Sequence, residues 1–189
     1  MNKNKIIEYF IRKAEIGDWE KTTIHEAETK LKFKKNKIIE FFKEKEAFLA
    51  FYFEEIDKRV LKSVNKEDFK ISNPEEILQE FLMNKLELMN NHKLGISNII
   101  NYYICNPKFL LLNLKTNKSS IENFLSQFKF KNNILKKKLL IKLILTVWLL
   151  AFRSWLYENH ENSISYSIID KGFKRIKKST KLLDIVIKK

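Results

Sequence analysis

Apolar residues recur at the helical period along most of the chain, and this pattern predicts an all-α fold. The first predicted helix covers residues 4–16 and should end at Gly17-Asp18, because glycine is the usual helix stop. Its apolar face would hold Ile6, Ile7, Phe10, Ile11 and Ala14. Only 3 glycines and 2 prolines occur in 189 residues, which favours long helices joined by few loops.

Capping signals divide the rest of the chain into further helices. Thr23 and Glu26 have the spacing of a capping box, in which a hydroxyl and a carboxylate satisfy the first backbone donors of a helix. Asn73-Pro74 marks another helix start, and Ser119 opens a second capping-box sequence. Gly95 is expected at a boundary between helices. The predicted helices cover residues 24–31, 36–42, 45–56, 74–89, 96–105, 134–158 and 163 onward.

The most apolar stretch of the chain, residues 143–152, lies between Lys142 and Arg153. A membrane-spanning helix needs about 20 apolar residues, so this stretch predicts a buried core helix. Because this helix is apolar nearly all round, other helices or a second subunit must cover it. The aromatic residues expected in the core or in a dimer interface are Trp148, Phe152 and Trp155.

The side-chain inventory argues against an enzyme or a metal site. A single cysteine and three histidines exclude a disulfide framework and leave little material for zinc. The sequence contains no glycine-rich phosphate loop, no nucleophile elbow and no histidine–glutamate pair at metal spacing. We therefore expect no catalytic residue, no metal and no cofactor, and we interpret Cys105 as a small core residue. Without a signal-peptide pattern at its start, the chain is expected in the cytoplasm.

The formal net charge of +14 favours a polyanionic partner, either nucleic acid or an anionic membrane. Most of the excess lies late in the chain, since residues 134–189 carry a net charge of +9 and residues 1–50 only +3. The basic run 171–181 is interpreted as the solvated outer face of a helix, or alternatively as a face that lies on a membrane. A composition rich in Lys, Asn and Ile also fits an AT-rich genome, which is a second explanation of the charge.

Residues 17–26 and the run Phe42-Lys43-Glu44-Lys45 resemble the DNA-binding domain of the tetracycline-repressor (TetR) family. In that family a helix ends at a glycine, a threonine-capped helix and a recognition helix follow, and a Phe-x-x-Lys-Glu motif starts the fourth helix. The resemblance implies an N-terminal three-helix helix-turn-helix module over residues 1–56. A C-terminal helical bundle over residues 57–189 would bind an effector and form the dimer.

The resemblance implies double-stranded DNA as the partner. Residues 30–37 hold five lysines and no acid, a pattern that gives salt-sensitive binding to phosphates, although a solvated turn would look the same. The candidate DNA-binding residues are Thr23, His25, Lys34, Lys35, Lys37 and Lys45.

The resemblance also implies a transcriptional regulator that responds to a small apolar effector and forms a homodimer through residues 134–158 and 163–187. The residues proposed to bind this effector could instead pack in an ordinary core, and His92 could instead lie at the surface. The candidate ligand-binding residues are Phe81, Met89, His92, Tyr102, Tyr103 and Phe109.

The sequence departs from the family pattern in the helix-turn-helix itself. Leu31-Lys32 stands where the family usually has an alanine-glycine pair, Lys34 and Asn36 replace a small cap and a glycine, and Ile39 replaces an aromatic that touches DNA. These departures support an alternative function. The chain would then be a lipid-binding protein of the same fold with a vestigial DNA-binding module, similar to an accessory protein of ubiquinone biosynthesis.

Overall fold

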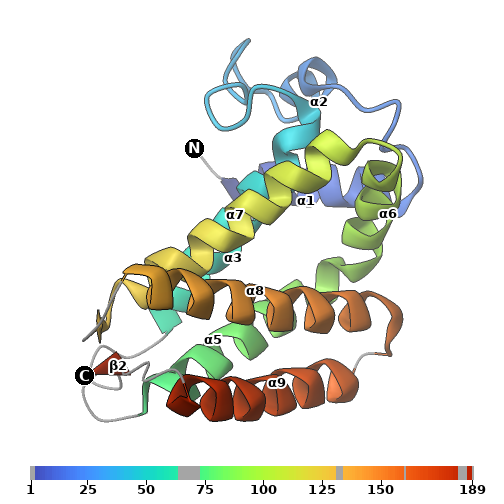
Figure 1. Ribbon diagram of the computed structural model, residues 1–189. Coiled ribbons are helices and arrows are strands. Elements are labelled where there is room, and N and C mark those ends of the chain that lie inside the picture. The colour runs from blue at the N-terminus through green and yellow to red at the C-terminus, as the bar shows by residue number, and fades with distance from the viewer. Residues whose placement is uncertain (1–2, 64–72, 131–133, 160, 183–186, 189) are drawn as a thin grey trace. The chain divides into compact units, whose positions relative to one another are not determined.

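The computed structural model in Figure 1 describes residues 3–63, 73–130, 134–159, 161–182 and 187–188, and this part of the chain is all-helical except for one two-residue strand pair. The chain forms two compact units. The first unit comprises residues 1–55 and 91–116, and the second comprises residues 56–90 and 117–189. The expected division into residues 1–56 and 57–189 stays a prediction; in the structure residues 91–116 group with the N-terminal residues.

The first unit contains α1 (Lys3–Glu15), α2 (Ile24–Lys30), α6 (Lys93–Ile104) and the beginnings of α3 (Phe48–Ser63) and α7 (Pro107–Leu125). A 3-10 turn over Lys45–Ala47 leads into α3. Aromatic rings fill the core of this unit. Phe10 stacks on Phe48 with ring centroids 5.1 Å apart, and Phe42 and Trp19 pack against the same two rings.

The second unit contains α5 (Pro74–Met89), α8 (Ile134–Tyr157) and α9 (Ser163–Leu182), together with the ends of α3 and α7. A 3-10 turn over Asn90–His92 follows α5. The helices α8 and α9 form an antiparallel hairpin and both pack against α5. The strands β1 (Lys129–Phe130) and β2 (Ile187–Lys188) pair in antiparallel fashion, with Lys129 opposite Lys188.

Several helix limits are confirmed together with the physical signals that predicted them. The Thr23 side chain accepts a hydrogen bond of 3.1 Å from the backbone N–H of Glu26, and the Asn73 side chain caps α5 in the same way. Gly17 ends α1 in the left-handed conformation, with φ of +79°. Asn106-Pro107 separates α6 from α7, because the residue before a proline avoids helical geometry.

Three predicted features are wrong. Residues 35–41 form turns and no regular helix, because the Glu28 carboxylate binds backbone N–H groups of this segment. Ser119 lies inside α7, where a continuous helix leaves no free backbone donors for a capping box. Gly95 lies inside α6 and is buried, so it does not mark a helix boundary.

Two glycines stand where helices cross too closely for a side chain. A Cβ on Gly95 of α6 would lie 2.8 Å from the backbone oxygen of Ile11 in α1. A Cβ on Gly172 of α9 would lie 2.6 and 2.7 Å from the two methyl carbons of Val147 in α8. Glycine lowers the intrinsic stability of a helix by about 1 kcal/mol relative to alanine, and here close packing offsets that loss.

We predict that Gly95→Ala and Gly172→Ala each destabilise the protein, because the added methyl group meets a carbonyl or a stiff branched side chain. Overpacking of this kind costs about 1–3 kcal/mol, which outweighs or cancels the helix-propensity gain. Chemical denaturation would measure the change in free energy of unfolding. The exposed positions Asn101 and Lys178, on the same two helices, provide alanine controls that should stay within about 0.5 kcal/mol of wild type. Stabilisation by either glycine replacement would contradict the prediction.

Candidate functional site

A buried carboxylate on α2 shapes the segment that follows this helix. Glu28 is 3% exposed, and its two oxygens accept hydrogen bonds from the backbone N–H groups of Asn36 at 3.0 Å and Ile38 at 2.8 Å. A buried carboxylate is costly unless hydrogen bonds satisfy it, and here the backbone of the following segment does so. Glu28 therefore fixes the path of the chain after α2. Glu28 was not among the residues expected to matter, and the one signal in the sequence was its place directly after Ala27, on the buried side of a short helix.

The backbone of this segment explains why no recognition helix forms. Lys32 and Asn36 adopt left-handed conformations, with φ of 54° and 64°, which interrupt a right-handed helix. One helical turn follows, in which the N–H of Phe42 bonds to the oxygen of Ile38 at 3.3 Å. Ile38 and Phe42 are buried, so both ends of this turn are anchored in the core of the first unit.

The structure places four exposed lysines on α2 and the segment behind it. Lys30, Lys32, Lys34 and Lys35 are exposed, and none of them makes an ion pair with the residues that the structure describes. We call these four residues the basic turn. Lys37, which was also expected to bind DNA, pairs with Glu40 at 2.6 Å. The candidate phosphate-binding surface is therefore the basic turn, with Lys37 partly neutralised.

Two further expected DNA contacts lie at the start of α2, at the opposite end of this helix from the basic turn. Thr23 and His25 are both exposed. The hydroxyl oxygen of Thr23 accepts the capping hydrogen bond described above, and that contact does not use the hydroxyl proton. Both side chains thus lie at the solvent side of the helix start, where backbone N–H groups favour anions.

Lys45 has contacts that compete with a phosphate. Its ammonium donates to the backbone oxygens of Trp19 at 2.8 Å and Glu20 at 3.0 Å, and it lies 5.3 Å from the centroid of the Trp19 ring. The side chain is only 11% exposed, and burial lowers the pKa of the ammonium group. Lys45 links the start of α3 to the chain after α1, so we leave it out of the candidate surface.

The helix α2 is held against α1 by Glu26. The Tyr9 hydroxyl donates to the Glu26 carboxylate at 2.8 Å, and the Lys13 ammonium lies 3.1 Å from the same oxygen. These contacts, the Tyr9 hydrogen bond first, lower the pKa of Glu26 from its ordinary value of 4.5. Glu26 thereby positions the helix from which the basic turn begins.

The six expected ligand-binding residues do not gather in one unit. Phe81 and Met89 are buried in the second unit, where Phe81 stacks on Phe124 at 4.2 Å. The other four belong to the first unit. His92 contacts the Tyr52 hydroxyl at 3.0 Å and the Glu8 carboxylate at 3.4 Å, so its ring nitrogens face protein groups.

The remaining three aromatic residues surround the end of α6. Tyr103 is fully buried, its hydroxyl donates to the backbone oxygen of Glu46, and burial raises its pKa. The Phe109 ring packs 5.5 Å from that of Tyr103. Tyr102 lines an open hollow of about 670 Å³ together with Cys105, which is exposed. The expectation that Cys105 is a core residue is therefore wrong.

The second unit contains a buried lysine that the sequence analysis missed. Lys85 is 1% exposed, and its ammonium lies 2.6 Å from Asp57, 3.2 Å from the Ser120 hydroxyl and 4.6 Å from the centroid of the Trp148 ring. Lys85 falls four residues after Phe81 and four before Met89, on the apolar stripe of α5. Its position on that stripe was the signal that could have revealed it.

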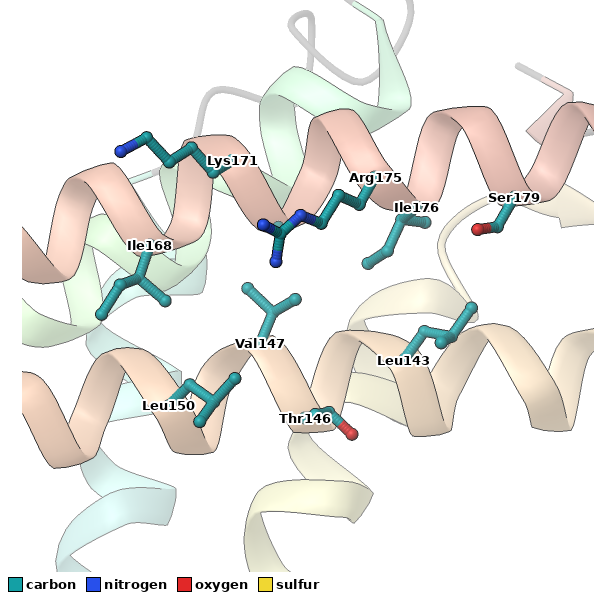
Figure 2. Close-up of a pocket in the computed structure, with 10 residues that line it drawn as sticks. Leu143, Thr146, Val147, Leu150, Ile168, Lys171, Arg175, Ile176 and Ser179 are labelled. Atoms are coloured by element: carbon teal, nitrogen blue, oxygen red, sulfur yellow. The ribbon is translucent and has the colours of Figure 1, made fainter.

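A groove runs between α8 and α9, as Figure 2 shows, with a volume of about 480 Å³. The middle of the groove lies at the crossing of Gly172 and Val147. Lys171 and Arg175 of α9 both line it; in Figure 2 the Arg175 guanidinium points toward α8, whereas the end of the Lys171 side chain points away from the gap. Its remaining lining residues are Leu143, Thr146, Leu150, Ile168, Ile176 and Ser179.

The apolar helix was expected to be buried, and α8 is buried on one face. Trp148 and Trp155 are in the core, where their ring N–H groups donate to Asn117 and Asn90. On the remaining surface of α8, Leu149 and Leu150 are 39% and 53% exposed. Within the described residues, α8 is the one helix whose length and apolar composition would suffice to cross a membrane, a test that core helices of soluble proteins also pass.

No family model, curated protein or solved structure matches this chain. Its function must therefore be inferred from its own residues and their contacts.

We predict that Glu26 contributes pH-dependent stability. Because the folded protein lowers its pKa, this contribution is present at neutral pH and is lost as the pH falls below about 4.5 and protonates the carboxylate. Glu26→Gln should therefore lower the melting temperature at pH 7, and its difference from wild type should shrink at pH 3. Glu54→Gln, the same change at an exposed position, is the control. An equal difference at both pH values would contradict this role.

We also predict a strong coupling between Asp57 and Lys85. Asp57→Ala leaves a buried ammonium without its counter-ion, which costs about 3–5 kcal/mol of unfolding free energy. Adding Lys85→Met removes that charge and places an apolar chain between Phe81 and Trp148, so the double variant should recover much of the loss. Urea denaturation of the two single variants and the double variant measures the coupling. A double variant no more stable than Asp57→Ala would refute it.

Proposed function

We propose that the protein is a TetR-like DNA-binding transcriptional regulator whose first unit binds the phosphate backbone through the basic turn. The observation that carries this proposal is the set of four exposed lysines that lack ion pairs to the described residues, on a backbone held by Glu28. Lysines of this kind are surrounded by counter-ions in solution. Binding to DNA releases the counter-ions of the phosphates, which drives association at low salt.

The conformation of Lys32 supports the resemblance to the TetR family. The family usually has glycine at this place, and glycine is the residue that adopts a left-handed backbone most readily. In this chain Lys32 adopts that conformation, with φ of 54°. A turn of the family's type can therefore persist although the glycine is absent, and the lysine adds a charge where the family has none.

The same geometry limits how the protein would read base sequence. One helical turn from Ile38 to Phe42 stands in place of a recognition helix, and Ile39 is its 41% exposed apolar residue. A short turn presents few side chains to the major groove, whereas lysines bind phosphates regardless of sequence. We therefore propose that phosphate contacts supply most of the affinity and that base contacts supply a smaller part.

A regulator of this type would act as a homodimer, so that two basic turns meet two half-sites on DNA. The exposed apolar residues Ile134, Leu139 and Leu149 of α8, none of which lines the groove between α8 and α9, offer surface for such a contact. A small effector would then act by favouring one arrangement of the two DNA-binding units over another.

We predict that DNA binding depends steeply on salt through the basic turn. Titration of the protein with its own upstream DNA, from low to physiological salt, gives the slope of log affinity against log salt. Each lysine–phosphate contact contributes about 0.9 to that slope, so Lys32→Gln, Lys34→Gln and Lys35→Gln together should reduce it by roughly 2–3. A matched triple replacement at the exposed residues Lys115, Lys138 and Lys142 should leave the slope unchanged.

A scrambled duplex of equal length separates a specific regulator from a merely basic protein. A regulator should prefer its own upstream DNA by roughly a thousandfold. Equal weak binding to both duplexes, reduced equally by the two triple variants, would refute the proposal. The alternative of a lipid-binding protein with a vestigial DNA-binding module would then take its place.

A further inference from the structure

We infer that the groove between α8 and α9 binds a single-chain amphiphile with an anionic head group, of the chemical class of a fatty acid. This site lies wholly within the second unit and does not rest on the proposed DNA binding. It also differs from the expected effector site, since none of the six residues expected to bind a ligand lines the groove.

The shape of the groove favours a chain-like ligand. Its lining residues extend from Leu143 to Leu150 on α8 and from Ile168 to Ser179 on α9. At 1.5 Å per helical residue, the α9 side is roughly 16 Å long. Apolar side chains from both helices line it along this length, and Figure 2 shows them on either side of the gap. The volume of about 480 Å³ lies within the usual range of small-molecule sites.

The crossing of the two helices gives the groove its floor. Gly172 allows α9 to approach Val147 of α8 so closely that no side chain fits between them. Helices that touch at their middle leave a continuous furrow along the contact, which an acyl chain can follow. Burial of this chain would remove its methylene groups from water, which stabilises the complex.

The charges at the groove select the head group. Lys171 and Arg175 are four residues apart on α9 and therefore lie on the same helix face. Both are exposed, and neither makes an ion pair with the described residues, whereas the neighbouring Asp170 is bound by Lys174 at 2.7 Å and Gln79 at 3.3 Å. Arg175 thus presents a guanidinium to the groove without an ion pair to the described residues, while Lys171 lies at the margin of the groove, near Asp170. An arginine can bind a carboxylate through two parallel hydrogen bonds.

The same charges argue against a second copy of the chain as the occupant. A two-fold symmetric contact centred on the groove would bring Lys171 and Arg175 close to the identical cations of the other copy. Like charges that lose solvent on contact repel each other, so such an interface would need an anion between the copies. An anionic amphiphile supplies both the negative charge and the apolar chain that the groove lacks.

The test is calorimetric titration of the full chain with dodecanoate below its micelle concentration. We expect saturable binding of one dodecanoate per chain, and at least tenfold weaker binding of dodecyltrimethylammonium, which has the same chain and the opposite charge. The double variant Lys171→Gln/Arg175→Gln should bind dodecanoate roughly 10- to 100-fold more weakly, because charge-assisted hydrogen bonds to the head group are lost. A second variant, Thr146→Trp, places a large side chain in the groove at an exposed lining position. It should abolish dodecanoate binding although Lys171 and Arg175 are both retained.

The matched control is Lys142→Gln/Lys178→Gln, which makes the same change in charge at exposed residues of α8 and α9 that do not line the groove. It should change dodecanoate affinity by less than threefold. Equal affinity for the anionic and the cationic detergent would overturn the inference. Binding to phosphatidylglycerol vesicles alone, weakened equally by both double variants, would overturn it in favour of a membrane surface. No dodecanoate binding, together with a dimer that Thr146→Trp dissociates in sedimentation velocity, would overturn it in favour of a second copy.

Discussion

Close helix crossing at glycine is the constraint on which both units depend. Gly95 allows α6 to lie against the backbone of α1, and α1 in turn supplies Tyr9 and Lys13, which hold Glu26 of α2. The basic turn starts at the end of that helix. In the second unit, Gly172 sets the distance between α8 and α9 and so creates the groove. The groove is thus a consequence of one missing side chain, and Gly95 supports the helix against which α2 is held.

Buried charges have different consequences in the two units. Glu28 is satisfied by backbone donors of the segment that follows it, so its burial organises a surface turn. Lys85 is satisfied by Asp57 and Ser120 and lies against aromatic rings, so its burial fixes the register of helices within a core. In both cases removal of one partner would leave an unpaired group with little access to water, which is costlier than never having buried the pair.

Local signals in the sequence predicted most helices, because caps, proline and apolar periodicity act over a few residues. Thr23 and Asn73 cap the starts of α2 and α5 with their side-chain oxygens, and Gly17 adopts the left-handed conformation after α1. The errors arose where distant residues decide the outcome. Glu28 draws residues 36–38 out of a helical path, and Gly95 serves a crossing with α1 that no local pattern reveals. The basic turn was visible as a lysine cluster, whereas the groove at α8 and α9 depends on contacts between helices and could not be located from periodicity.

In the basic turn, the residues that hold the backbone in place differ from the lysines that carry the positive charge. The backbone of residues 36–38 is held by a carboxylate of the preceding helix, and Ile38 and Phe42 supply the apolar anchors, while the exposed lysines take no part in either. Substitutions at Lys30, Lys34 and Lys35, whose backbones are not left-handed, can therefore accumulate without unfolding the turn. Over evolutionary time such a turn could gain or lose affinity for polyanions one charge at a time. This affinity can therefore change while the fold of the first unit stays the same.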